Sequence, residues 1–224
     1  QRRRPPDPLN WLQAAWLFHW TRKNPRREER HGRPVVAHEG FRLATTRNLL
    51  LHRAVTDRIG GFNEALTTGE DTDFAFRAYQ AGVPVLGVPA LVVYHHGEPA
   101  TLGQFFRQQL WHANRKSYRE IVKESGGRVG GNAPLFTLAF LLSALIALAG
   151  LAGSALSHSP WCLTGALPWL AVVGGPAFLM CARARSWRHL PALCLLYATY
   201  GLARSIDLLG LHPAKPSWKS PAPR

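Results

Sequence analysis

The pattern of hydrophobic and polar positions divides the chain into a polar first part and an apolar second part. Residues 129–182 contain no Asp, Glu, Lys or Arg. A soluble domain of this size does not leave so long a run without charge, so the pattern predicts helices that cross a membrane.

Two apolar runs form the predicted membrane hairpin, and a third is ambiguous. Residues 134–156, at 1.5 Å per residue, are long enough to cross a hydrocarbon core of about 30 Å, and residues 161–182 follow after a short break. The third run, 190–211, contains Arg204 and Asp207, whose spacing would let them pair on one helix face. We expect either a third pass or an interfacial helix there.

The positions of basic residues predict the orientation of these passes. The connection within the hairpin has no Lys or Arg, whereas the next connection contains Arg183, Arg185 and Arg188. Basic loops stay in the cytoplasm. We therefore expect a multi-pass protein of the cell (inner) membrane with its polar part in the cytoplasm. The basic tail, 212–224, also suits the cytoplasm, which argues against an odd number of passes.

Composition excludes several classes of protein. The chain has 224 residues, with Lys+Arg 27 and Asp+Glu 13, giving a net charge of +14. A disordered chain, a coiled coil and a disulfide scaffold do not fit this composition. The three cysteines lie in the apolar part without regular spacing, which argues against disulfides and zinc. No recognition fold surrounds the Arg-rich stretch 22–33, so we expect no nucleic-acid partner.

Two amphipathic helices are predicted in the polar part. Leu9, Leu12, Trp16 and Trp20 recur at helical spacing. This helix could lie among lipid headgroups or pack against its own domain. A second one, over 102–122, is expected to rest on the membrane surface, as an anchor or as one wall of a site.

The segment from residue 48 to residue 96 has the richest pattern. It predicts a strand at 48–51, a helix at 54–59, a glycine turn at 60–61, a helix ending at Gly82 and β-rich chain over 83–94. Glu70, Asp71 and Asp73 lie where a helix N-terminus favours negative charge, and capping alone would explain them. His95 and His96 follow the last expected strand. A carboxylate can accept a proton from an attacking hydroxyl, and imidazole binds divalent metals.

These residues carry a resemblance to a known family. The ordered motifs are Ile59-Gly-Gly-Phe-Asn-Glu64, then Gly69-Glu-Asp-Thr-Asp-Phe74, then Arg77, Gly82, Pro89 and His95. Over about residues 35–120 the chain resembles the C-terminal part of the catalytic domain of inverting glycosyltransferases of family 2. The resemblance implies an α/β fold, a partial Rossmann-like GT-A domain over 1–125, followed by transmembrane helices over 134–211 and the basic tail.

The resemblance also implies an activity and its partners. A membrane-anchored enzyme would transfer a sugar from a nucleotide-sugar donor to a lipid-linked or polysaccharide acceptor, with a divalent metal, Mn or Mg. Asp71 matches the family's base, Glu70 would orient the site or meet the acceptor, and His95 matches a metal ligand, with His96 as its competitor. Asp73 could instead cap its helix, paired with Arg77. The implied substrate-binding residues are Asn48, Gly69, Asp73, Gln108, Trp111 and Arg115.

The sequence also departs from the family pattern. No Asp-x-Asp stands before Glu70, and the chain starts like neither a signal peptide nor a domain. We therefore expect a fragment without the nucleotide-binding half, inactive alone unless a partner chain supplies it. Leu110 replaces the Arg of the Gln-x-x-Arg-Trp element of processive members, so we do not expect processive synthesis. The alternative function is a non-catalytic membrane scaffold that carries a degenerate transferase remnant.

Overall fold

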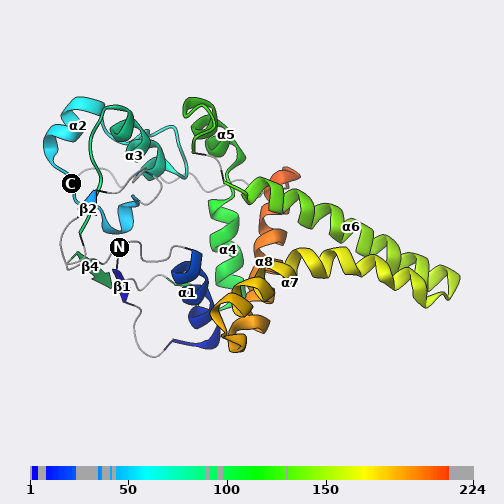
Figure 1. Cartoon of the computed structure of the whole chain (residues 1–224). Helices are drawn as coiled ribbons and strands as arrows, with labels where there is room; N and C mark the ends of the chain where they lie inside the picture. The colour runs from blue at the N-terminus through cyan, green and yellow to red at the C-terminus, as the bar shows by residue number, and fades with distance from the viewer. Residues whose placement is uncertain are drawn as a thin grey trace, which may run out of the picture.

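The protein consists of three parts (Figure 1). A small polar body contains the short strands and the described residues 41–94, a helical base contains the helices within 11–23, 102–124 and 187–208, and a long helical hairpin comprises residues 133–184. The structure is a computed structural model that describes residues 2–4, 9–23, 35–36, 41, 44–88, 91–94, 98–129 and 131–211. In Figure 1 the polar body lies at one end of the molecule, and the hairpin projects from the base at the other end.

The described strands are short and form two separate pairs. Strand β1 (Arg2–Arg4) runs parallel to β4 (Val92–Tyr94), and β2 (Val35–Val36) runs antiparallel to β3 (Leu86–Gly87). The strand predicted at 48–51 is wrong, because residues 46–48 form the 3₁₀ turn η2 (Thr46–Asn48) and residues 49–52 join no described strand. No continuous sheet connects these pairs within the described residues, so the α/β fold stays a prediction.

Helix α3 (Glu70–Gln80) holds the polar body together. Its buried face packs Ala75 and Phe76 against Phe41 and Ala44, with the rings of Phe41 and Phe76 5.2 Å apart. The predicted short helix is confirmed as α2 (Arg53–Ile59), and it leads through a glycine turn into the loop before α3. The start of α3 lies beside η2, where Asp71 Oδ2 is 3.4 Å from Thr46 N.

The single helix expected over 102–122 is wrong, because the chain forms two helices there. They are α4 (Leu102–His112) and α5 (Arg115–Glu124). Ala113 leaves helical geometry at φ −77° and ψ 86°, and the Asn114 side chain accepts a hydrogen bond from Ser117 N at 3.1 Å. A side-chain oxygen of this kind satisfies a free N–H at a helix start, so Asn114 begins α5 as an N-cap.

The predicted hairpin is confirmed as helical. It comprises α6 (Ala133–Ser157), the 3₁₀ segment η3 (Pro160–Ala166) and α7 (Leu167–Ala184). Within the described residues, Ala133–Ser157 and Pro160–Ala184 are long and apolar enough to cross a membrane, with mean hydropathies of 2.4 and 1.6. Only 17% of each of these windows is buried, so most of their apolar side chains face outward, as expected of helices that contact lipid. These helices support association with a membrane.

The third apolar run forms α8 (Leu190–Leu208), preceded by the 3₁₀ turn η4 (Trp187–His189). Helix α8 crosses the base of the hairpin instead of running along it (Figure 1). Leu193 and Leu196 are fully buried in a core shared with α1 (Trp11–Lys23), α4, α6 and α7. This position agrees with the interfacial alternative, and the third pass stays a prediction.

The predicted pair between Arg204 and Asp207 is wrong. Arg204 Nη1 instead donates to the His112 carbonyl oxygen at 3.3 Å, and Asp207 Oδ2 accepts from Arg115 N at 3.2 Å. Both side chains therefore connect α8 to the junction between α4 and α5. The prediction of free cysteines is confirmed, because Cys162, Cys181 and Cys194 form no disulfide.

Helix α1 packs against its own protein. Leu12 and Ala15 are fully buried in the base core, and the Trp16 ring meets the Phe105 ring edge-on at 4.9 Å. At the other end of α1, Phe18 stacks on the buried ring of His189, with the centroids 4.5 Å apart. Burial lowers the pKa of His189, and the charge of Arg188 lowers this pKa further. A neutral His189 can accept the Arg188 Nε hydrogen bond, which spans 3.1 Å.

Gly201 lets α8 approach α6 closely. A Cβ atom at this position would overlap the ring of Phe140, which is itself buried. Because an aromatic ring in a packed core cannot move aside cheaply, Gly201→Ala is expected to destabilise the base by about 1–3 kcal/mol. Thermal unfolding of the detergent-solubilised protein measures this loss. The control is Gly174→Ala in α7, where a Cβ would meet nothing within 4 Å; equal loss from both variants would contradict the packing argument.

Candidate functional site

The start of α3 is set by a glycine in a left-handed conformation. Gly69 has φ 83°, and a Cβ atom there would lie 2.7 Å from Ile121 Cδ1 on α5. The left-handed backbone geometry favours glycine at this position, and a Cβ there would also push the tip of the Ile121 side chain aside. The prediction of an acidic helix start is confirmed, because Glu70, Asp71 and Asp73 occupy the first turn of α3.

Asp71 is half-buried and held by backbone groups. Its Oδ1 accepts hydrogen bonds from Thr72 N at 2.8 Å and from the Thr72 hydroxyl at 3.3 Å. Its Oδ2 lies 3.4 Å from Thr46 N, the first residue of η2. The N-terminal end of a helix attracts negative charge, and these N–H groups add to that attraction. The carboxylate is therefore fixed between α3 and η2 without a basic side chain among the described residues as its partner.

Glu70 is the second acidic residue at this end of α3 that has no basic side chain as a partner among the described residues. It is half-buried, and among the described residues its carboxylate has no hydrogen bond or ion pair. A carboxylate in that state remains able to meet a ligand. Glu70 and Asp71 thus form a pair of adjacent carboxylates at one helix end.

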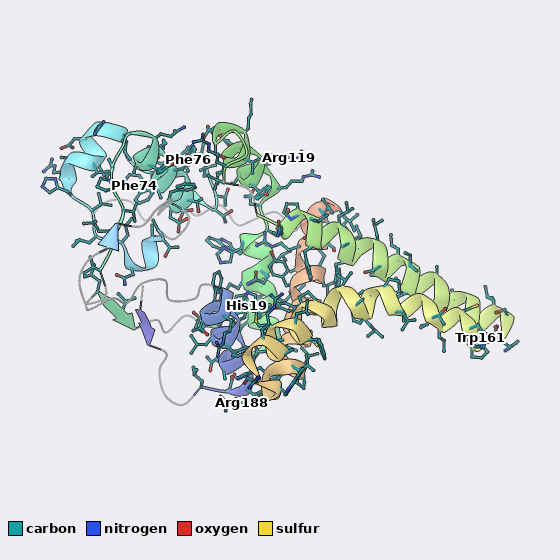
Figure 2. The ribbon with its side chains drawn as sticks, in the orientation of Figure 1. His19, Phe74, Phe76, Arg119, Trp161 and Arg188 are labelled. Atoms are coloured by element: carbon teal, nitrogen blue, oxygen red, sulfur yellow. The ribbon has the colours of Figure 1, made fainter. Side chains whose placement is uncertain are left out.

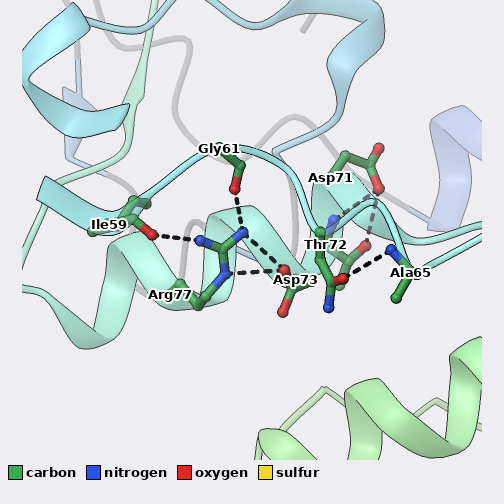
Figure 3. A network of polar contacts seen from close by, with 8 residues as sticks. Ile59, Gly61, Ala65, Asp71, Thr72, Asp73 and Arg77 are labelled. Carbon is green, nitrogen blue, oxygen red and sulfur yellow. Dashed lines mark hydrogen bonds and ion pairs between the residues drawn. The ribbon is translucent and has the colours of Figure 1, made fainter. Parts of the chain in front are cut away.

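Asp73 takes a different part, in a network that joins α3 to the glycine turn (Figure 3). It is 4% exposed and accepts from Arg77 Nε at 3.0 Å and Nη2 at 2.9 Å. Arg77 also donates from Nη1 to Ile59 O at 2.7 Å and from Nη2 to Gly61 O at 2.8 Å. The predicted Asp73–Arg77 pair is therefore present, and it favours a supporting function for Asp73 over direct contact with substrate.

Asn48 connects the site to the end of the polar body. Its Nδ2 donates to Leu91 O at 3.1 Å, just before β4. Strand β4 ends at Tyr94. The proposed metal ligand His95 and its competitor His96 come next in the chain, outside the described residues.

The remaining predicted residues lie on α4 and α5. Gln108 and Trp111 belong to α4, which packs mainly against α8, and the Trp111 side chain is 49% exposed. Arg115 begins α5, and its Nη1 donates to Leu208 O at 3.3 Å at the end of α8. The structure therefore brings together Asn48, Gly69, Glu70 and Asp71, and places Gln108, Trp111 and Arg115 at the base.

Several residues that shape the site were missed from the sequence. Thr46, which lies before the strand predicted at 48–51, was assigned no function. On α5, Ser117 and Ile121 are buried, and the Ser117 hydroxyl accepts from Thr67 N at 3.2 Å. Asn114 followed by a polar, helix-favouring segment is the N-cap signal that could have revealed α5 and these contacts.

A metal site is not defined by the described residues. They contain no group of three or more His, Cys, Asp or Glu that could hold a metal ion. Glu70 and Asp71 offer oxygen ligands of the type that Mg²⁺ and Mn²⁺ prefer, but two adjacent carboxylates are too few.

Comparison with known proteins assigns the family. The profile described as Glycosyl transferase family group 2 matches residues 26–206, which is most of the chain and includes α2 to α7 and nearly all of α8, but neither β1 nor α1. Searches of curated proteins and of solved structures gave no match. The match covers the acidic start of α3, the Arg77 network and the two apolar helices together, and the chain belongs to glycosyl transferase family group 2.

Proposed function

We propose that the protein is a membrane-anchored inverting glycosyltransferase in which Asp71 is the catalytic base. Family membership makes it a glycosyltransferase, an enzyme class that uses a nucleotide-sugar donor and a glycan acceptor in general. The observation that carries the assignment to Asp71 is its fixed, half-buried carboxylate at the start of α3, free of any described basic side chain.

The proposed reaction is a single in-line displacement. An acceptor hydroxyl oxygen attacks the anomeric carbon of the donor sugar, and the bond from that carbon to the diphosphate oxygen breaks. The hydroxyl proton passes to the Asp71 carboxylate, and the electron pair of the broken bond leaves with the nucleoside diphosphate. A positioned general base contributes about 10²–10⁴-fold to such a step. Attack from the face opposite the leaving group inverts the anomeric configuration.

The neighbouring residues position this reaction in the proposal. Glu70 would accept a hydrogen bond from the acceptor, because its carboxylate has no partner among the described residues. Asn48 holds η2 against the chain before β4, and η2 in turn contacts Asp71. Asp73 would act indirectly, since Arg77 occupies one of its carboxylate oxygens. A divalent metal, Mn or Mg, with His95 as one of its ligands stays a prediction, and the proposed displacement does not depend on it.

The organisation of the chain in the membrane is also part of the proposal. Residues 1–125 would form the C-terminal part of a GT-A domain on the cytoplasmic face, with 134–211 as the membrane region. The acceptor would be lipid-linked or a polysaccharide, because the hairpin keeps the polar body beside the bilayer. Gln108, Trp111 and Arg115, at the base of the hairpin, would then lie on the acceptor side.

The test is an assay of sugar transfer with membranes from cells that contain the protein at its natural length. Membranes are incubated with a panel of radiolabelled nucleotide sugars, and labelled product is measured in the lipid and polysaccharide fractions. The expected result is at least tenfold more product from one donor than in membranes from a deletion strain. If no donor gives product above the deletion strain, the scaffold alternative replaces the enzymatic proposal.

A further inference from the structure

A pocket opens where α5, the start of α6 and the end of α8 meet. Its volume is about 210 Å³, and none of Glu70, Asp71 or the network of Figure 3 lines it. The residues that line it are Asn114, Arg115, Tyr118, Arg119, Ala133, Pro134, Thr137, Arg204, Asp207 and Leu208. The pocket therefore lies apart from the proposed base Asp71, and it shares only Arg115 with the residues proposed to bind substrate.

The charged groups around this pocket are mainly cationic. Three arginines line it, against the single carboxylate of Asp207, which already accepts from Arg115 N. Arg119 is exposed on α5, and its guanidinium has no acceptor among the described residues (Figure 2). Arg204 Nε is buried and likewise has no hydrogen-bond partner in the described structure. Arg204 Nη1 already donates to His112 O, and its Nε is closed off from the pocket surface, so the exposed guanidinium of Arg119 is the group that an anion at the mouth of the pocket would meet.

The walls of the pocket are apolar. Ala133, Pro134 and Leu208 line it together with the ring of Tyr118. Ala133 and Pro134 are also the first residues of α6, the more apolar of the two hairpin helices. The N-terminal end of a helix carries partial positive charge, and no side chain caps α6. A ligand that is anionic at one end and apolar at the other matches both features.

We infer that this pocket binds the phosphate headgroup of a membrane lipid, with the hydrocarbon chains directed along α6. Arginine forms strong, paired hydrogen bonds with phosphate oxygens, and cationic residues gather where a membrane helix leaves the bilayer. The apolar walls favour a lipid over free inorganic phosphate, which would leave them in contact with water. The inference depends on α6 entering the bilayer and does not depend on the function of Asp71.

Binding at this pocket would brace the proposed catalytic site through α5. One side of α5 presents Arg115, Tyr118 and Arg119 to the pocket. The other side buries Ser117 and Ile121 against the loop that sets Gly69 and the start of α3. A bound lipid would therefore restrain the helix that positions this loop.

The experiment measures thermal unfolding of the full chain in dodecyl maltoside by tryptophan fluorescence. Three additions are compared: dioleoylphosphatidylglycerol, dioleoylphosphatidylcholine and sodium phosphate. At saturation, phosphatidylglycerol is expected to raise Tm by about 4 °C, at least three times the shift from either other addition. Equal shifts from the two lipids would overturn the inference, as would a shift from sodium phosphate as large as that from phosphatidylglycerol, because the bound group would then be free phosphate.

Substitutions locate the effect. Arg119→Gln changes an exposed side chain and should leave Tm without lipid unchanged, while the shift from phosphatidylglycerol falls at least twofold. Arg204→Gln should reduce the shift further. The matched control is Arg183→Gln, an exposed arginine in the last turn of α7 that does not line the pocket. A full shift in Arg119→Gln, or an equal reduction in Arg183→Gln, would overturn the assignment to this pocket. Sugar transfer is not part of this measurement, so its result is independent of the proposed activity.

Discussion

Asp71→Asn is expected to lower kcat for sugar transfer by about 10²–10⁴-fold while donor affinity stays within about twofold. The amide is nearly isosteric with the carboxylate but cannot accept the proton of the acceptor hydroxyl. The Asn oxygen can still accept from Thr72 N, which is the shorter of the two backbone contacts. The fold at the start of α3 should therefore persist. Single-turnover transfer with the donor identified by the membrane assay, together with donor binding, measures both quantities.

The matched control for this variant is Asp57→Asn. Asp57 is an exposed acid on α2 that lies outside the network around α3. It should retain at least half of the transfer rate. Unchanged turnover in Asp71→Asn, or equal loss in both variants, would remove Asp71 from the position of base. Glu70→Gln should cause a smaller loss that appears mainly in KM for the acceptor.

Arg77→Gln is expected to destabilise the polar body by about 2–4 kcal/mol. The substitution leaves the buried carboxylate of Asp73 without its counter-charge. It also removes the donors of two carbonyl oxygens, those of Ile59 and Gly61. The network is partly open to water, since the Arg77 side chain is 28% exposed, which keeps the expected cost below that of a fully buried pair. Hydrogen exchange by mass spectrometry should show at least tenfold faster exchange of the amides of α3.

Arg77→Lys separates charge from geometry in this network. Lysine keeps the positive charge but presents one ammonium group, which cannot reach Asp73 and both carbonyls together in the planar arrangement of arginine. Protection of α3 should fall to a value between those of the native protein and Arg77→Gln. Full protection in Arg77→Lys would mean that charge alone holds the turn, and full protection in Arg77→Gln would mean that the network does not stabilise α3.

Helical features of this chain were predictable because their signals are local. The acidic cluster indicated the start of a helix, which was predicted from Asp73 and begins at Glu70, and the run without charged residues indicated the hairpin. The break between α4 and α5 was missed because the aromatic residues continue at helical spacing across Ala113, and the N-cap function of Asn114 was overlooked. A local signal was present there but was outweighed by periodicity.

The site was predictable only in part, because its contacts join distant segments. The family motifs identified Glu70, Asp71 and the Asp73–Arg77 pair. The approach of Ile121 to Gly69 and of Thr46 to Asp71 depends on how α5 and η2 pack, which no spacing in the sequence encodes. The strand expected at 48–51 failed for a similar reason, since its apolar residues indicated extended chain but not a pairing partner.

In the proposed membrane hairpin, the close fit between α6 and η3 bears on how the two helices would enter the bilayer. The backbone of Gly165 meets that of Ile146 and Gly150, and a Cβ at Gly165 would lie 3.1 Å from Ile146 O, so the two arms are joined along their far ends. The connecting residues 158–159 contain no Asp, Glu, Lys or Arg. If α6 and α7 insert together as one pair, their connection therefore carries no Asp, Glu, Lys or Arg side chain across the hydrocarbon core. The proposed membrane hairpin would therefore insert without the free-energy cost of moving a charged turn across the hydrocarbon core.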